Sequence, residues 1–69
     1  MDAGEQFGRN LRIQRRRAGL TQEQLAHAAS VHPSEVSRLE CAERDPRLST
    51  IVRLADALGV PPGRLVDGS

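Results

Sequence analysis

Residues 20–25, with the sequence LTQEQL, contain a complete signal for the start of an α-helix. The hydroxyl group of Thr21 can accept a hydrogen bond from the first turn, and the Gln24 side chain can reach back to the Thr21 backbone as a capping box. Leu20 can pack onto Leu25, which fixes the angle at which the chain enters the helix. We therefore predict a helix that begins directly after Thr21.

A first helix is predicted upstream of this signal, over Gln6–Ala18. Its apolar residues Phe7, Leu11 and Ala18 share one face, as expected for a helix that packs on a core. Gly19 follows directly and is typical of a helix end.

The helix after Thr21 is short and rich in alanine, so that another helix can approach it closely. It is predicted to end at Ala29, where a turn over Ser30–His32 begins. Pro33 then favours the first turn of a third helix, since the N–H that proline lacks would be unpaired there anyway. We predict that this third helix extends to Cys41.

A polar loop over residues 42–46 separates the third helix from a fourth. Gly59 ends the fourth helix, and Pro61-Pro62 can open a last helical turn that runs through Leu65 and Val66. The apolar face predicted for the fourth helix consists of Leu48, Ile51, Val52, Leu54, Ala55 and Leu58.

The composition limits the size and class of the fold. The chain has 69 residues, of which 38% are hydrophobic, enough for one small core but not for two domains. Its β-branched residues never alternate as a half-buried strand requires. We expect an all-α fold, organised as a single domain over residues 1–69.

The charged and reactive side chains exclude several functions. Because Cys41 is the lone cysteine, no disulfide can form within the chain, and no apolar run after Met1 indicates a signal peptide or membrane span. His27, His32 and Cys41 lack the paired spacing of structural zinc sites. No nucleophile-elbow motif is present. We expect a cytoplasmic protein that is not an enzyme and uses no cofactor or metal.

Arginine dominates the basic side chains, although the net charge is only +1. All ten basic residues are Arg, and five of them lie within residues 9–17. The planar guanidinium group suits phosphate or carboxylate, while a solvated helix face is the alternative interpretation.

Two short helices joined by a turn over about residues 21–41 match the helix-turn-helix arrangement. The second helix opens with small polar residues and carries Arg38 one turn later. Such a helix fits the major groove of DNA, where side chains of its first two turns reach the base edges.

These segments resemble the Cro and phage-repressor class of helix-turn-helix regulators, also called the xenobiotic-response-element family. The resemblance covers roughly residues 7–66 and implies a compact five-helix, repressor-like domain. It is carried by Leu11-Arg12, Arg15, residues 19–26 (GLTQEQLA), residues 36–40 (VSRLE), Pro46 and residues 54–60 (LADALGV).

The resemblance implies which residues contact DNA. Arg38 can make a forked contact to guanine, with phosphate contact as its alternative. Glu35 can accept from a cytosine amino group, or it can cap the backbone N–H of His32 instead. The residues at the family's base-contacting positions are Pro33, Ser34, Glu35, Ser37 and Arg38.

Phosphate contacts are implied for a second set of side chains, in which Arg44 belongs to a loop that contacts DNA in the family. Arg17 and Arg47 are further candidates. The main candidates for phosphate contact are Gln22, Arg12, Arg16 and Arg44. Arg15 and Glu40 occupy positions that in many relatives form a structural ion pair.

Some residues depart from the family pattern. Ser30 and Ala42 replace glycines, so we expect backbone strain at Ser30, where the turn favours a left-handed conformation. His32 replaces a more common Ser or Thr cap, and Pro33 replaces a longer polar residue that contacts bases.

The sequence therefore predicts a sequence-specific transcription regulator, a repressor that binds double-stranded DNA with a palindromic operator as a homodimer and associates with the nucleoid. The alternative is a protein-interaction module, such as an antitoxin or the DNA-binding domain of a larger regulator. The apolar residues expected to remain for dimerisation are Leu58, Val60, Leu65 and Val66.

Overall fold

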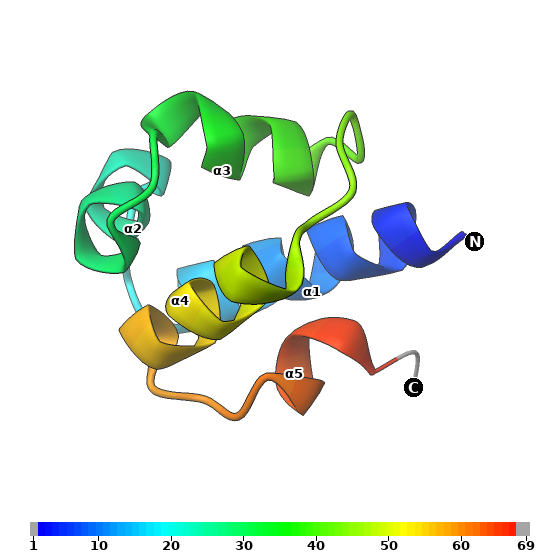
Figure 1. Cartoon of the computed structure of the whole chain (residues 1–69). Coiled ribbons are helices and arrows are strands. Elements are labelled where there is room, and N and C mark those ends of the chain that lie inside the picture. The colour runs from blue at the N-terminus through cyan, green and yellow to red at the C-terminus, as the bar shows by residue number, and fades with distance from the viewer. Residues whose placement is uncertain (1, 68–69) are drawn as a thin grey trace.

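The computed structural model describes residues 2–67, and every regular element in that range is a helix (Figure 1). The predicted all-α architecture with five helices is confirmed. The helices in chain order are α1 (Ala3–Arg17), α2 (Gln22–Ala29), α3 (Pro33–Glu40), α4 (Leu48–Leu58) and α5 (Gly63–Val66). Helix α3 packs on α1 and α2, whereas α4 packs on α2 and α5 on α1.

Helix α1 begins three residues before its predicted start at Gln6. Asp2 caps it, because the Asp2 carboxylate accepts a hydrogen bond of 2.8 Å from the Glu5 backbone N–H. Phe7 and Leu11 are buried as predicted, but Ala18 is exposed and lies just beyond the helix. The prediction for Ala18 was wrong because the helix ends one residue earlier.

The capping box at the start of α2 is confirmed. The backbone N–H of Gln24 donates to the Thr21 hydroxyl at 3.0 Å, and the backbone N–H of Thr21 donates to Gln24 Oε1 at 2.9 Å. Leu25 is fully buried, and Leu20 packs against the same core. This pair of hydrogen bonds fixes the direction in which the chain enters α2.

The turn between α2 and α3 has the left-handed residue that the sequence predicts. Ser30 has φ 57° and ψ 41°, and its backbone N–H donates to the carbonyl oxygen of His27 at 3.2 Å. Ala42, just after α3, has φ 59°. Both residues adopt a conformation that glycine tolerates at lower cost, so strain is present on both sides of α3.

Helices α1 and α3 cross in close contact at Gly8. A Cβ atom at this position would lie 2.5 Å from the Leu39 carbonyl oxygen and 2.8 Å from that of Glu40. Only glycine lets the two backbones approach this closely. The contact places the end of α3 directly over the middle of α1.

Helix α4 is more exposed on its apolar face than the sequence indicates. Leu54 and Ala55 are fully buried, but Leu48 is 76% exposed and Val52 is also exposed. The core is completed from another direction by Leu65 of α5, which is fully buried. Leu65 is therefore not available for dimerisation, which corrects the prediction.

Asn10 holds α5 against α1. Its side-chain amide donates to the carbonyl oxygen of Leu65 at 3.0 Å and to that of Asp67 at 2.8 Å. The Gln6 amide in turn donates to Asn10 Oδ1 at 3.2 Å, which orients the Asn10 side chain. These hydrogen bonds satisfy carbonyl groups at the end of a helix too short to satisfy them itself.

Candidate nucleic-acid interface

Helix α3 has one buried face and one exposed face. Val36, Leu39 and Glu40 are buried against α1 and α2. On the opposite side, Ser34 and Arg38 are four residues apart and both exposed, so they project from the same face of the helix. The exposed face of α3 is thus polar, small at its start and basic near its end.

The start of α3 is fixed by two features of the turn. Pro33 is the first helical residue, and the His32 ring caps the helix, because Nδ1 accepts a hydrogen bond of 3.1 Å from the Ser34 backbone N–H. Among the predicted base-contacting residues, Pro33, Ser34 and Arg38 are exposed and Glu35 and Ser37 are half-buried. The structure thus groups these residues on or beside the free face of α3.

Glu35 has a partner that the sequence analysis did not predict. Its Oε1 accepts a hydrogen bond of 2.8 Å from Arg44 Nη1, which ties α3 to the loop that follows it. No hydrogen bond joins the Glu35 side chain to the backbone N–H of His32 among the described residues, so the alternative of a cap at this position was wrong.

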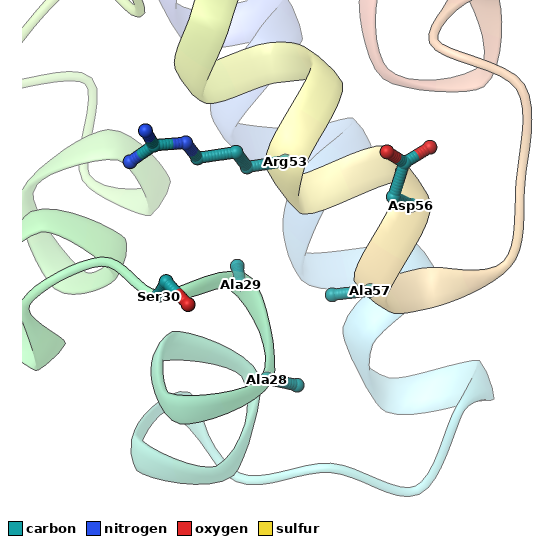
Figure 2. Close-up of a pocket in the computed structure, with 6 residues that line it drawn as sticks. All are labelled: Ala28, Ala29, Ser30, Arg53, Asp56 and Ala57. Atoms are coloured by element: carbon teal, nitrogen blue, oxygen red, sulfur yellow. The ribbon is translucent and has the colours of Figure 1, made fainter.

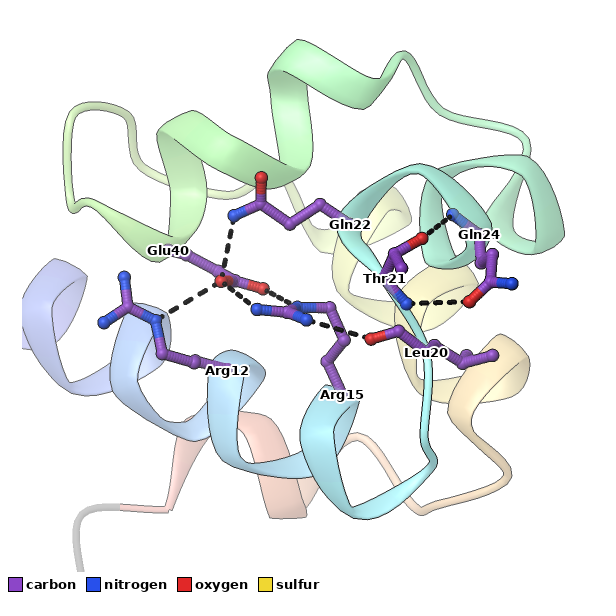
Figure 3. Close-up of polar contacts among 7 residues, drawn as sticks. All are labelled: Arg12, Arg15, Leu20, Thr21, Gln22, Gln24 and Glu40. Atoms are coloured by element: carbon purple, nitrogen blue, oxygen red, sulfur yellow. Dashed lines mark hydrogen bonds and ion pairs between the residues drawn. The ribbon is translucent and has the colours of Figure 1, made fainter.

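Glu40 collects hydrogen bonds from three side chains on two other helices (Figure 3). Arg15 donates from Nε to Glu40 Oε2 at 2.6 Å and from Nη2 to Oε1 at 3.1 Å. Arg12 Nε and Gln22 Nε2 also donate to Oε1, at 3.4 Å and 3.1 Å. These four residues, here called the Glu40 network, connect α1, α2 and the end of α3.

The Glu40 side chain is completely buried, yet it remains an anion. Burial alone acts to raise its pKa, but the hydrogen bonds from Arg15 and Gln22 and the positive charge of Arg15 outweigh that effect. The pKa of Glu40 therefore lies below its ordinary value of 4.5. The hydrogen bond to Glu40 likewise raises the pKa of Arg15.

The predicted phosphate-contacting residues fall into two places. Arg12 and Arg16 lie on the surface of α1, where they border a shallow hollow together with Glu40. Gln22 is linked to Arg12 through Glu40, which accepts a hydrogen bond from both side chains. Arg44 lies apart from them in the loop before α4, where it pairs with Glu35 of α3.

Arg44 has basic neighbours in a hollow of about 600 Å³ between the start of α3 and α4. Arg47 and Arg53 line this hollow with it, as does Glu35. Arg53 also borders a hollow of about 450 Å³ beside the end of α2, and Figure 2 shows its side chain extending away from α4 on the side of Ser30. Arg53 could not be identified from the sequence, because its position depends on how α4 packs on α2.

None of the helices within residues 2–67 has the length and apolar character that a membrane-spanning segment requires. Within the same range, no three His, Cys, Asp or Glu side chains lie close enough together to hold a metal ion.

Comparison with known proteins relates this geometry to regulators. The control protein C.SmaI of Serratia marcescens is 36% identical over 66 residues, which are 96% of this chain and 79% of that protein. The controller protein C.AhdI of a restriction-modification system from Aeromonas hydrophila superposes with a TM-score of 0.87 at 37% identity, covering 90% of this chain and 94% of that chain.

A third relative was solved with DNA. The P22 c2 repressor, in complex with a synthetic operator, superposes with a TM-score of 0.83 at 25% identity, covering 91% of this chain and 96% of that chain. The profile of the helix-turn-helix domain family matches residues 6–67. The chain therefore belongs to the helix-turn-helix domain family, of the Cro and phage-repressor type that its sequence resembles.

Proposed function

We propose that this protein is a transcription regulator, a repressor that recognises a palindromic operator through α3 in the major groove. The observation that carries the proposal is the free face of α3, where small polar residues and Arg38 stand exposed while the opposite face is fixed to the core. A rigid helix with such a face can enter the groove without rearrangement. The likeness to a repressor solved with operator DNA supports the same function.

In this proposal, residues from the elements around α3 bind the phosphates of the DNA backbone. Gln22, Arg12 and Arg16 contact phosphates from α1 and α2, and Arg44 does so from the loop before α4. Arg47 adds a further positive charge beside Arg44. Arg15 and Glu40 support this arrangement from within as a structural ion pair.

We further propose that bases are recognised by residues of α3 alone. Pro33, Ser34, Ser37 and Arg38 face the groove, and Arg38 pairs with guanine. Glu35 accepts from a cytosine amino group while its second carboxylate oxygen stays bonded to Arg44. The neighbouring cation makes a carboxylate tolerable so close to phosphates.

A second copy of this chain is the partner we propose for the apolar surface, defined by Leu48, Val52 and Val66. All three side chains are exposed, and a hollow of about 640 Å³ between α1, α4 and α5 is lined by Phe7, Ile51 and Val66. Pairing of two identical copies buries such a surface on both and gives the two-fold symmetry that a palindromic operator requires.

The proposed regulator acts on DNA of the nucleoid, within the cytoplasm, and performs no catalytic step. The alternative is a protein-interaction module, and the exposed apolar surface is the observation that favours it.

Selection of bound duplexes from a random pool tests the function directly. We expect a palindromic consensus. In a salt titration of the selected duplex, the logarithm of the association constant should fall linearly with the logarithm of the salt concentration, with a slope of about −0.9 for each phosphate neutralised. An unrelated duplex should bind far more weakly at the same salt concentration. Equal, weak binding to both duplexes with no consensus would instead favour the interaction module.

A further inference from the structure

We propose that Glu40 is a positioning residue for DNA-phosphate binding, because its buried carboxylate holds the Gln22 amide and the Arg12 guanidinium in place before DNA arrives. This inference rests on the proposed function. It assigns Glu40 a role beyond the ion pair with Arg15, since Arg12 and Gln22 donate to the same oxygen, Oε1, from two different helices.

The N–H groups of Gln22 and Arg12 that are not bonded to Glu40 suit a phosphate. An amide NH₂ group has two N–H bonds, and Gln22 uses one of them on Glu40, so the second remains available. Arg12 uses its Nε, and Figure 3 shows both of its terminal nitrogens pointing away from Glu40. A phosphate oxygen only accepts hydrogen bonds and therefore matches these free N–H groups.

The burial of the carboxylate makes the arrangement rigid. Glu40 is held from the other side by Arg15, whose guanidinium also donates to the Leu20 carbonyl oxygen at 2.9 Å. An anion fixed in this way limits the rotamers of Gln22 and Arg12, so less conformational entropy is lost when they bind DNA. The cation of Arg15 offsets the repulsion between Glu40 and an approaching phosphate.

A purely structural ion pair predicts a different result from a positioning residue. Replacement of Glu40 by glutamine removes one negative charge, and by Coulomb attraction alone this change raises the affinity for polyanionic DNA. If Glu40 positions the two donors, the same change lowers the affinity. The two roles therefore predict changes of opposite sign.

The experiment compares Glu40→Gln with the matched control Glu43→Gln, which removes an exposed carboxylate in the loop after α3. Affinity per folded molecule is measured on a labelled duplex of random sequence at about 0.1 M salt. We expect Glu40→Gln to bind about tenfold more weakly than wild type. Glu43→Gln should bind as tightly as wild type or more tightly.

The outcomes separate this inference from the function on which it rests. If the wild type binds neither this duplex nor any duplex selected from a random pool, the proposed function fails, and the role of Glu40 fails with it. If the wild type binds and Glu40→Gln binds equally well or better, the function stands and only the positioning role is overturned.

A measurement on the unaltered protein covers the case in which Glu40→Gln does not fold. Nuclear magnetic relaxation of the side-chain amides in the DNA-free protein should show Gln22 as rigid as the backbone. Gln14 is the control, because its side chain makes no hydrogen bond among the described residues. Addition of the duplex should shift the Gln22 signal, and a Gln22 amide as mobile as that of Gln14 would overturn the inference.

Discussion

Arg15 is the residue whose loss should weaken the fold most among the arginines of α1. Its side chain is largely buried and donates twice to the buried Glu40, whereas Arg16 is exposed. We expect Arg15→Ala to lower the free energy of unfolding by about 3 kcal/mol, since it leaves an anion without its main partner. The control Arg16→Ala should change it by less than about 0.5 kcal/mol. Urea denaturation of both variants measures the difference, and equal values would contradict it.

The stability difference between wild type and Arg15→Ala should depend on pH. Because the folded protein holds the pKa of Glu40 below 4.5, the ionised carboxylate stabilises the fold above that pH. The contribution disappears as the pH falls through the lowered pKa, where Glu40 takes up a proton. Thermal unfolding from pH 7 towards pH 2 should show the two curves converging. A gap that stays constant over this range would exclude Glu40 as its source.

The network around Glu40 shows how far individual residues can be predicted. The pairing of Arg15 with Glu40 was implied by the resemblance, and the two residues are in contact. The convergence of Arg12 and Gln22 on the same oxygen was not predicted, because it depends on side chains from two helices meeting at a third. The pairing of Glu35 with Arg44 was missed for the same reason, since a loop conformation brings them together.

Helices α1 and α3 depend on Gly8 at their crossing. We expect Gly8→Ala to destabilise the protein by about 2 kcal/mol, because the added methyl group meets backbone carbonyl oxygens that cannot move aside cheaply. Gly63→Ala in α5 is the control, since nothing lies within 4 Å of a Cβ atom there. Thermal denaturation distinguishes them, and a Gly8→Ala variant as stable as wild type would show that the helices can separate without loss.

Local signals predicted several helix boundaries, although the equally local Asp2 cap at the start of α1 was missed. The capping box of Thr21 and Gln24 lies within a few residues, as do Pro33 at the start of α3 and Gly59 at the end of α4. The role of Gly8 could not be found in this way, because its partners lie more than one helix further along the chain. The exposure of Leu48 was also unpredictable, since periodicity places it on the apolar face but not against a neighbour.

The assembly of two copies should depend on the apolar surface. We expect Leu48→Glu to dissociate the proposed dimer, because a carboxylate would be buried between two copies without a partner. Ile13→Glu is the control for the mass measurement alone, as Ile13 is an exposed apolar residue on α1 outside this surface but borders the hollow that Arg12 and Arg16 line. Sedimentation velocity measures the mass of each variant, and binding to a full operator should weaken together with dimerisation. A dimer that survives Leu48→Glu would place the interface elsewhere.

The hydrogen bonds of Asn10 bear on which part of the molecule unfolds first. Its two hydrogen bonds join residues that are 55 and 57 positions apart in the sequence, so forming them closes a long loop. Closing a loop of this length costs more conformational entropy than forming any contact between α2 and α3. The last helix is thus the element expected to detach first, while the helix-turn-helix stays packed. Because Val66 belongs to the apolar surface, such a detachment would separate the two copies of the proposed dimer without unfolding α3. The strength of the proposed pairing would then depend on how firmly Asn10 and the buried Leu65 hold α5 to the rest of the molecule.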